Sequence, residues 1–174
     1  MVVLFDADSL VYSSCCGVDD ILDEAIGKFD EIFMSIVNRL EETYQIERVI
    51  TFNNSKGNFR KLLDPNYKAN RKKSDKHFHE QKSQIISIIK ECFPFTTAVH
   101  PKLECDDTIA TLVKVHCQKG DSCTIISSDS DFYQLLNVFE NCQIYNPIKK
   151  KIIEKPDYDY VTWKALKGDL TDNI

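Results

Sequence analysis

Short runs of apolar residues alternate along this chain with longer stretches whose apolar residues recur every three or four positions. The first pattern is typical of buried β-strands, and the second is typical of helices that cover them. The short runs predict five strands, at residues 2–5, 48–52, 95–99, 122–127 and 143–145. The periodic stretches predict five helices, at residues 21–40, 78–92, 104–118, 131–138 and 160–167.

This alternation predicts an α/β fold, a three-layer and mostly parallel twisted sheet with helices on both faces. A basic stretch at residues 56–93 interrupts it, and the first part of that stretch shows no apolar face, so we expect an arm or loop there. The lysine-rich run at 149–151 leads into a short extension of the sheet. At 174 residues with 43% hydrophobic content, the chain is expected to form one domain, residues 1–174, and a monomer.

The net charge of −5 is unevenly distributed along the chain. Residues 56–76 contain eight Lys or Arg residues and two Asp residues, a local charge of +6, so the remainder carries −11. A concentrated basic segment on an acidic body favours a polyanionic partner, although a solvated basic loop has the same pattern. The seven cysteines lack C-x-x-C spacing and no apolar run reaches the about 18 residues of a membrane helix, so we expect a cytoplasmic protein with reduced thiols.

Acidic residues cluster where the predicted strands end, and parallel strands bring those ends to one edge of the sheet. Taken singly, each cluster also fits an ordinary helix cap. Capping explains the whole set poorly, because two carboxylates about 4 Å apart repel each other by roughly 4 kcal/mol near a protein surface. The candidate carboxylates are Asp6, Glu104, Asp106, Asp107, Asp129, Asp131, Asp169 and Asp172.

Bound cations would relieve that repulsion. Oxygen ligands without His or Cys favour a hard divalent ion, Mg²⁺ with Mn²⁺ as a substitute, and disfavour zinc. Two such ions about 4 Å apart support hydrolysis of a phosphodiester, because they stabilise both the attacking and the leaving oxygen. The acidic clusters therefore indicate a two-metal phosphodiesterase.

Four motifs, taken in order, resemble the 5′-nuclease superfamily of flap endonucleases, the 5′-nuclease domain of DNA polymerase I and phage RNase H. In chain order they are Asp6; Tyr67-Lys68-Ala69-Asn70-Arg71; Glu104-Cys105-Asp106-Asp107; and Ser128-Asp129-Ser130-Asp131-Phe132-Tyr133-Gln134-Leu135, followed by Lys167-Gly168-Asp169-Leu170-Thr171-Asp172-Asn173-Ile174. Each motif is weak alone, but their order and spacing cover essentially the whole chain.

The resemblance implies a PIN-like domain that hydrolyses DNA or RNA:DNA hybrids near a free 5′ end, at flaps or nicks, during replication or repair. It implies two divalent ions. The ligands implied for the more tightly held ion are Glu104, Asp106, Asp107 and Asp129. Those implied for the second are Asp131, Asp169 and Asp172, with Asp6 between the two sets.

The basic segment takes its role from the same resemblance. Lys68 and Arg71 correspond to cations directed at the scissile phosphate, where they stabilise charge that develops in the transition state. Tyr67 either stacks on a base or packs beneath Lys68, and residues 68–93 correspond to the arch through which such enzymes thread a single strand. Contacts to the nucleic-acid backbone are expected from Arg60, Lys72 and Lys73.

Two features depart from the family pattern. Asn53 stands at the end of the second strand, where the family usually has Asp; it keeps an oxygen ligand but removes one charge, so Asn53→Asp is expected to lower the Mg²⁺ requirement. Relatives continue beyond the position of Ile174 with a helical-hairpin module that grips duplex, so we expect a further segment or a separate chain to supply duplex binding. The compact layout is reminiscent of phage enzymes, which act in the host cytoplasm.

Two other functions stay open. Asp6-Ala7-Asp8 and Gly168-Asp169 with Asp172 resemble the nucleophile and metal motifs of haloacid-dehalogenase-like phosphatases, which form an aspartyl-phosphate. That function leaves the other acidic clusters and the basic segment without a task. A catalytically impaired nucleic-acid-binding module also fits, because of Asn53. Metal-dependent cleavage of nucleic acid distinguishes these functions.

Overall fold

The computed structural model describes residues 1–15, 22–52, 58–70, 76–93 and 95–169, without the side chains of residues 76 and 77. These residues form a sheet in the order β3-β2-β1-β4-β5-β6, parallel except for the antiparallel β6. The strands are β1 (Val2–Asp6), β2 (Arg48–Phe52), β3 (Thr96–Ala98), β4 (Cys123–Ile126), β5 (Cys142–Asn146) and β6 (Lys151–Ile152). The predicted α/β architecture is confirmed.

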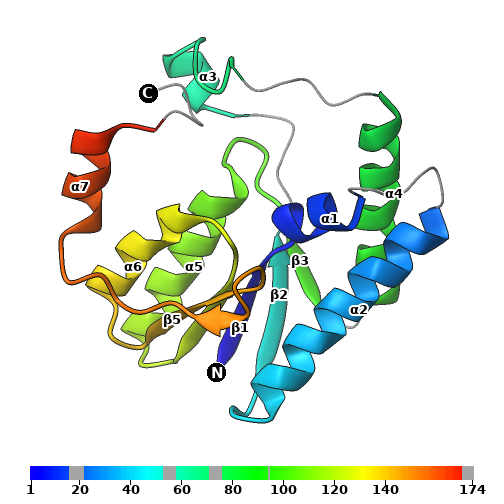
Figure 1. The fold of residues 1–174 in the computed structure, drawn as a ribbon, viewed down its shortest axis with the longest axis horizontal. Coiled ribbons are helices and arrows are strands. Elements are labelled where there is room, and N and C mark those ends of the chain that lie inside the picture. Colours follow the sequence, from blue (N-terminus) through cyan, green and yellow to red (C-terminus); the bar gives the residue numbers. More distant parts are fainter. Residues whose placement is uncertain (16–21, 53–57, 71–75, 94, 170–174) are drawn as a thin grey trace.

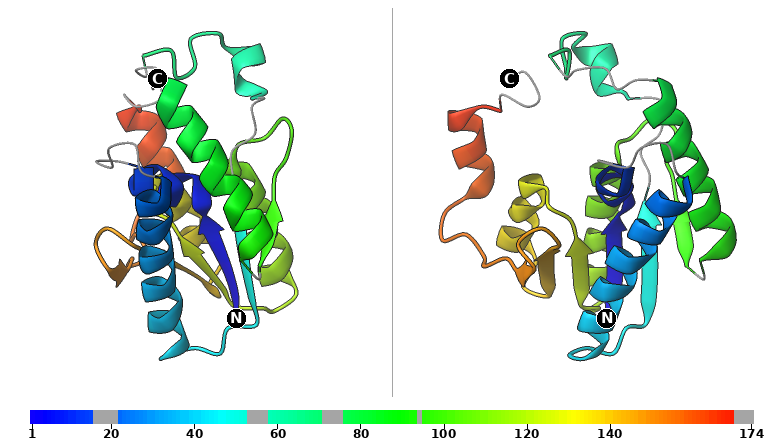
Figure 2. Two further views of the ribbon diagram at one scale, coloured as in Figure 1. Left: turned by 90° about the vertical axis from the view of Figure 1, so that its right-hand side faces the viewer. Right: turned by 45° about the vertical axis from the view of Figure 1, so that its right-hand side comes forward.

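Helices cover both faces of this sheet (Figures 1 and 2). One face carries α1 (Ala7–Cys15), α2 (Leu22–Glu41) and α4 (Lys76–Cys92). The other carries α5 (Cys105–Gln118) and α6 (Tyr133–Val138), which follows the 3-10 turn η1 (Ser130–Phe132). The remaining two, α3 (Arg60–Leu63) and α7 (Tyr160–Lys167), stand apart from the layers near the carboxyl ends of the parallel strands. None of the described helices is both long and apolar enough to cross a membrane.

β1 divides the hydrophobic core into two halves. Val2 and Leu4 pack in the cluster that includes α5, whereas Val3 and Phe5 pack in the cluster that includes α1, α2 and α4. Side chains alternate along a strand, so a strand covered on both faces is apolar at every position. This explains the uninterrupted apolar run that predicted β1.

α1 was not predicted from the sequence pattern. Its buried face consists of Ala7, Leu10, Val11, Ser14 and Cys15, which is regular helical spacing. Three of these side chains, those of Ala7, Ser14 and Cys15, are small, and this hides the stripe in a search for large apolar residues. The helix begins directly after β1, so it places Asp6 at a strand-to-helix junction.

The segment expected to form an arm has two structurally different parts. In α4, Ile85 and Ile89 are buried in the core with α2, so this helix belongs to the body of the domain. Residues 58–70 form turns around the short α3, which was not predicted because its Leu62 and Leu63 are exposed and give no buried stripe. Tyr67 attaches this part of the segment to the body, since its ring is buried.

Candidate active site

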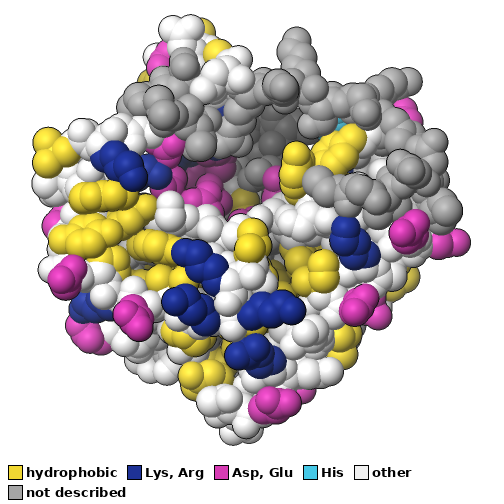
Figure 3. Space-filling model, in the orientation of Figure 1, with side chains coloured by type: hydrophobic (Ala, Val, Ile, Leu, Met, Phe, Trp, Pro, Cys, Tyr) yellow, Lys and Arg dark blue, Asp and Glu magenta, His cyan; other side chains and the backbone are white. Residues whose placement is uncertain are grey.

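A cavity of about 940 Å³ opens at the carboxyl ends of the parallel strands. Acidic side chains lie in the corresponding hollow of the surface (Figure 3). Residues 58–70, the start of α5, the loop after β4 and α7 form the walls of this cleft. The predicted site residues that line it are Arg60, Tyr67, Lys68, Glu104, Asp106, Asp107, Asp129, Asp131 and Asp169.

Asp6 lies behind this cleft, at the end of β1, and is only 7% exposed. Its carboxylate accepts hydrogen bonds from Ser127 Oγ at 2.8 Å, the Ser9 backbone N–H at 3.3 Å and Cys105 Sγ at 3.6 Å. Burial raises the pKa of Asp6 despite these hydrogen bonds. Asp6 lines a second cavity, on the α1–α2 side of the sheet, and three surrounding segments fix its position.

The first turn of α5 carries three of the predicted carboxylates. Glu104 is the residue before the helix, and Asp106 and Asp107 lie in its first turn, so the positive end of the helix dipole lies among them. The pKa of Asp106 is raised to about 7, first by burial and then by the negative charges of Asp6, Asp129 and Glu104. Carboxylates from three distant parts of the chain therefore share one electrostatic environment.

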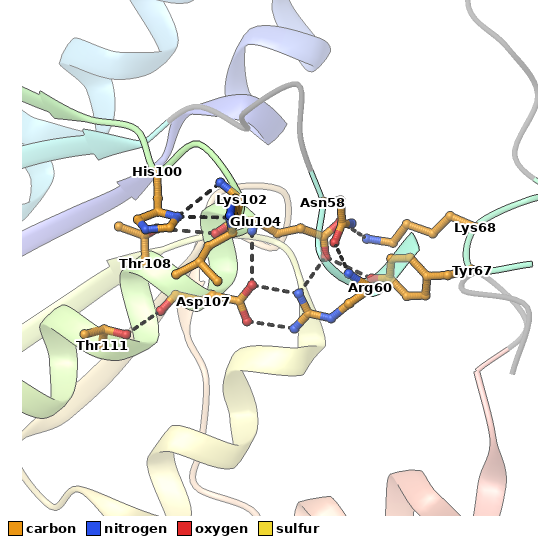
Figure 4. A network of polar contacts seen from close by, with 11 residues as sticks. Asn58, Arg60, Tyr67, Lys68, His100, Lys102, Glu104, Asp107, Thr108 and Thr111 are labelled. Atoms are coloured by element: carbon orange, nitrogen blue, oxygen red, sulfur yellow. Dashed lines mark hydrogen bonds and ion pairs between the residues drawn. The ribbon is translucent and has the colours of Figure 1, made fainter. Parts of the chain in front are cut away.

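Cations from residues 58–70 contact two of these acids (Figure 4). The Lys68 ammonium lies 2.8 Å from Glu104 Oε1. Both terminal nitrogens of Arg60 donate to Asp107, each at 2.7 Å, and this bidentate contact lowers the pKa of Asp107. Neither pair is close in sequence, so α5 and residues 58–70 must pack together to form them.

Tyr67 and Lys68 form one structural unit against Glu104. The Tyr67 hydroxyl donates to Glu104 Oε2 at 2.9 Å, and the Lys68 Nζ atom lies 4.8 Å from the centre of the Tyr67 ring. Asn58 adds a further hydrogen bond to Glu104 Oε1, at 2.8 Å. Packing beneath Lys68, one of the two roles expected for Tyr67, describes this geometry.

The opposite wall of the cleft supplies its own cation. Lys164 of α7 lies 2.6 Å from Asp131 Oδ1 and 2.6 Å from Asp169 Oδ2. Partial burial opposes the charge of Lys164, but the hydrogen bonds to both carboxylates raise its pKa. An ammonium group thus bridges two acids that were predicted to face a metal ion.

Within the described part of the chain, no three His, Cys, Asp or Glu side chains lie close enough together to hold one ion. Arg60, Lys68 and Lys164 each contact one of the predicted carboxylates, so a side-chain cation already lies against these acids. The predicted division of the acids into two ligand sets therefore stays a prediction.

The donor chemistry nevertheless fits a hard divalent cation. Burial, followed by the charges of three neighbouring carboxylates, raises the pKa of Asp106, and a bound cation would favour its ionised form. The acids offer oxygen donors, and burial raises the pKa of the neighbouring Cys105 thiol, which disfavours a thiolate ligand.

Helix capping accounts for part of the arrangement. Asp107 accepts a hydrogen bond from the Glu104 backbone N–H at 3.0 Å, and Asp129 accepts one from the Asp131 backbone N–H at 2.8 Å. It does not account for Asp106, whose burial beside three other carboxylates opposes its ionisation. The capping explanation is therefore incomplete for this set of acids.

Several predicted site residues lie outside the described residues: Asn53, Arg71, Lys72, Lys73 and Asp172. The predicted acids also contact residues that were not predicted from the sequence, among them Asn58, Ser127 and Lys164. A cation on the predicted helix 160–167, five residues before Asp169, was a usable signal for Lys164. Asn58 and Ser127 have no comparable signal, because polar residues beside strands and turns are common.

Residues 1–164 match the model of a family described as "5′-3′ exonuclease, N-terminal resolvase-like domain". A 5′-3′ exonuclease of Buchnera aphidicola is 28% identical over 185 residues, which span 99% of this chain and 64% of that protein. Ribonuclease H of bacteriophage T4 is 33% identical over 138 residues, which span 72% of this chain and 45% of that protein. The chain thus spans less than two thirds of the length of these relatives.

Solved structures share the fold. The D15 flap endonuclease of bacteriophage T5, solved with DNA and metal ions, has a TM-score of 0.75 at 20% identity. A T5 5′-exonuclease structure with bound zinc has a TM-score of 0.76 at 22% identity. Each match covers 99% of this chain and 68% of the T5 chain.

Proposed function

This chain belongs to the 5′-3′ exonuclease family, whose N-terminal resolvase-like domain spans nearly all of it, and we propose that it is a divalent-metal-dependent 5′ nuclease. The main support is the convergence of the partly buried Asp106 with Asp6, Asp129 and Glu104, whose negative charges help to raise its pKa to about 7. The proposed substrates are phosphodiesters near free 5′ ends of DNA, at flaps or nicks, or in RNA:DNA hybrids. The proposed setting is replication or repair in the cytoplasm.

The acids of the cleft are the proposed metal ligands. We assign Glu104, Asp106, Asp107 and Asp129 to one Mg²⁺ ion, and Asp131, Asp169 and Asp172 to a second. Asp6 would lie between the two sets. When bound, Mg²⁺ or Mn²⁺ supplies positive charge to the phosphodiester and activates water for attack.

Lys68 and Lys164 act from opposite walls of the cleft. Lys68 is held against Glu104 and above the Tyr67 ring, and Lys164 is held between Asp131 and Asp169. A phosphate that enters between these walls would meet cations whose positions are already fixed. Such preorganised charge stabilises negative charge that develops on the phosphoryl oxygens.

The phosphatase alternative requires Asp6 to act as a nucleophile. Asp6 is almost fully buried, accepts three hydrogen bonds and has a raised pKa. Burial limits the access of a phosphate to this carboxylate, and the hydrogen bonds occupy its oxygens, so the geometry favours the nuclease.

The test of the nuclease is cleavage of a 5′-labelled flap, a nicked duplex and an RNA:DNA hybrid, with Mg²⁺, with Mn²⁺ or with EDTA. We expect cutting near the 5′ end, loss of cutting in EDTA, and a rate at least about 100-fold lower in Asp129→Ala, the scale of losing one preorganised electrostatic contact. Asp30→Ala, an exposed position on α2, is the control for the same charge change and should cut normally.

Circular dichroism of Asp129→Ala should confirm that the variant is folded. Cutting by Asp129→Ala at the wild-type rate would contradict this site. Metal-independent binding of the flap without any cutting would favour the impaired binding module instead.

A further inference from the structure

α7, the loop before it and the first residue of α6 present a row of aromatic side chains to the cleft. This aromatic wall consists of Tyr133, Tyr158, Tyr160 and Trp163, all of which line the cavity together with Lys164 and Lys167. Hydrophobic side chains gather over this side of the molecule, next to the acidic hollow (Figure 3). The proposed hydrolysis gives these rings no task.

The rings form one contiguous group that extends from a buried ring to two accessible rings. Tyr160 is buried, and its ring centre lies 5.5 Å from Tyr133 and 5.5 Å from Trp163. Trp163 and Tyr158, whose ring centres are 5.8 Å apart, are 38% and 45% exposed. The inner rings thus support two outer rings whose surfaces remain accessible.

Hydrogen bonds hold the backbone that carries this wall. The Asn137 amide donates to the carbonyl oxygens of Pro156 at 3.3 Å and Tyr158 at 3.2 Å, and its oxygen accepts from the Tyr160 backbone N–H at 3.2 Å. Asp159 caps α7 by accepting from the Thr162 backbone N–H at 2.7 Å. A preordered aromatic surface loses little conformational entropy when it binds a ligand.

Cations are interleaved with the rings. Lys167 lies on the next turn of α7, with its Nζ atom 4.4 Å from the centre of the Trp163 ring. Charged residues are depleted at the centres of protein–protein interfaces. Aromatic rings interleaved with cations beside a binding cleft are typical of surfaces for single-stranded nucleic acid, where bases stack and phosphates contact the cations.

We propose that the aromatic wall binds the unpaired strand of the substrate by base stacking, with Tyr158 and Trp163 as the stacking surfaces and Lys167 as a phosphate contact. This inference rests on the proposed nuclease function and specifies which part of its substrate occupies this side of the cleft. Stacking is tolerant of base identity, because every base presents a π-face. The wall therefore selects unpaired bases and has no preferred sequence.

Trp163 is the single tryptophan of the chain, so its fluorescence reports on this surface. In EDTA, to prevent cutting, we expect a 5′ single-stranded flap to quench the emission and a blunt duplex to leave it nearly unchanged. The key probe is an abasic strand with the same number of phosphates, which keeps the electrostatic attraction and removes the bases. It should bind about 5- to 100-fold more weakly than the normal strand, without quenching.

Variants test the same surface by anisotropy of a labelled flap. Trp163→Ala and Tyr158→Ala should each weaken binding by about 5- to 100-fold, whereas Trp163→Phe should retain most of the affinity. Leu166→Ala is the control, because Leu166 lies on the same helix, is 85% exposed and is not among the residues that line the cleft. Circular dichroism identifies any variant that fails to fold. In that case the binding of Trp163→Phe and the binding of the abasic strand still test whether bases stack on this surface.

Equal affinity for abasic and normal strands would overturn the proposal, as would normal binding by Trp163→Ala. If the wild-type protein cuts the flap with Mg²⁺ while Trp163→Ala binds it normally, the stacking role of the aromatic wall is wrong and the proposed nuclease function is retained. If the flap quenches the Trp163 emission but no metal-dependent cutting is seen, the proposed nuclease function is wrong and the stacking role of the aromatic wall is retained.

Discussion

Neighbouring acids at the start of α5 experience opposite environments. Burial and three nearby carboxylates raise the pKa of Asp106 to about 7, whereas Arg60 lowers the pKa of Asp107. The sequence predicted both residues as members of one cluster. It did not predict that one would be neutralised by a cation 47 residues away while the other would not, because that contact exists only after folding.

These environments predict opposite pH effects on the free energy of unfolding in EDTA. The folded Asp106 carboxyl has a pKa of about 7 against 3.8 for the ordinary group, so the folded state binds more protons between these values and stability falls as the pH rises through them. Asp106→Asn cannot ionise at this position and so avoids this loss of stability. Its free energy of unfolding at pH 7.5 should exceed that of the wild type by on the order of 1–4 kcal/mol.

Asp107→Asn is the matched variant with the opposite sign. Its lowered pKa contributes stability that is present above the ordinary pKa and is lost as the pH falls, so the variant should be less stable than the wild type at pH 7.5. Urea unfolding at pH 4 and pH 7.5 measures both. Wild-type pH dependence in Asp106→Asn would contradict the charge cluster described here.

At the scale of elements, long periodic helices and apolar strands were predictable, and their bounds agree with the structure to within about three residues. The elements that were missed have weak stripes, because α1 buries small side chains and α3 exposes its leucines. The position of α4 was also not predictable. Its basic neighbours suggested an arm, but the side on which its isoleucines pack depends on the tertiary fold.

The attachment of α4 to the body predicts a specific loss of stability. Ile89 is 1% exposed, so Ile89→Ala leaves a cavity and should lower the free energy of unfolding by about 2–4 kcal/mol. Lys90→Ala, an exposed position on the same helix, should change it by less than about 0.5 kcal/mol. Chemical denaturation compares the two, and equal stabilities would show that α4 is detached from the core in solution.

At the scale of the whole molecule, sheet topology brings the candidate site together. β1 lies between β2 and β4, so Asp6 comes close to residues that follow β3 and β4, about 100 or more positions later in the chain. Several strand orders are compatible with the sequence. In each of them, the carboxyl ends of the parallel strands lie at the same edge of the sheet. For that reason the acids were predictable as a group and their partners were not.

The cleft joins acids on its floor to cations on its walls, and this predicts a steep salt dependence of nucleic-acid binding. Among the described residues, four cations line the cavity: Arg60, Lys68, Lys164 and Lys167. Four phosphate contacts by a single strand give a slope of about −3 in a plot of log affinity against log salt, roughly a 50-fold loss between 50 and 200 mM.

Anisotropy of a labelled single strand in EDTA measures this slope. Lys167→Ala should reduce it by about 0.7 if Lys167 contacts one phosphate. A slope near zero would show that ionic contacts contribute little to binding.

The backbone at Lys68 adopts a left-handed conformation, with φ of 57°. Glycine adopts this conformation without strain, whereas a residue with a Cβ atom does so at a cost of about 1–2 kcal/mol. Glycine would relax the turn but would leave Glu104 without its ammonium partner. At this position the backbone conformation favours glycine, whereas the ion pair with Glu104 requires lysine. The chain therefore keeps a locally unfavourable backbone conformation where it places a positive charge.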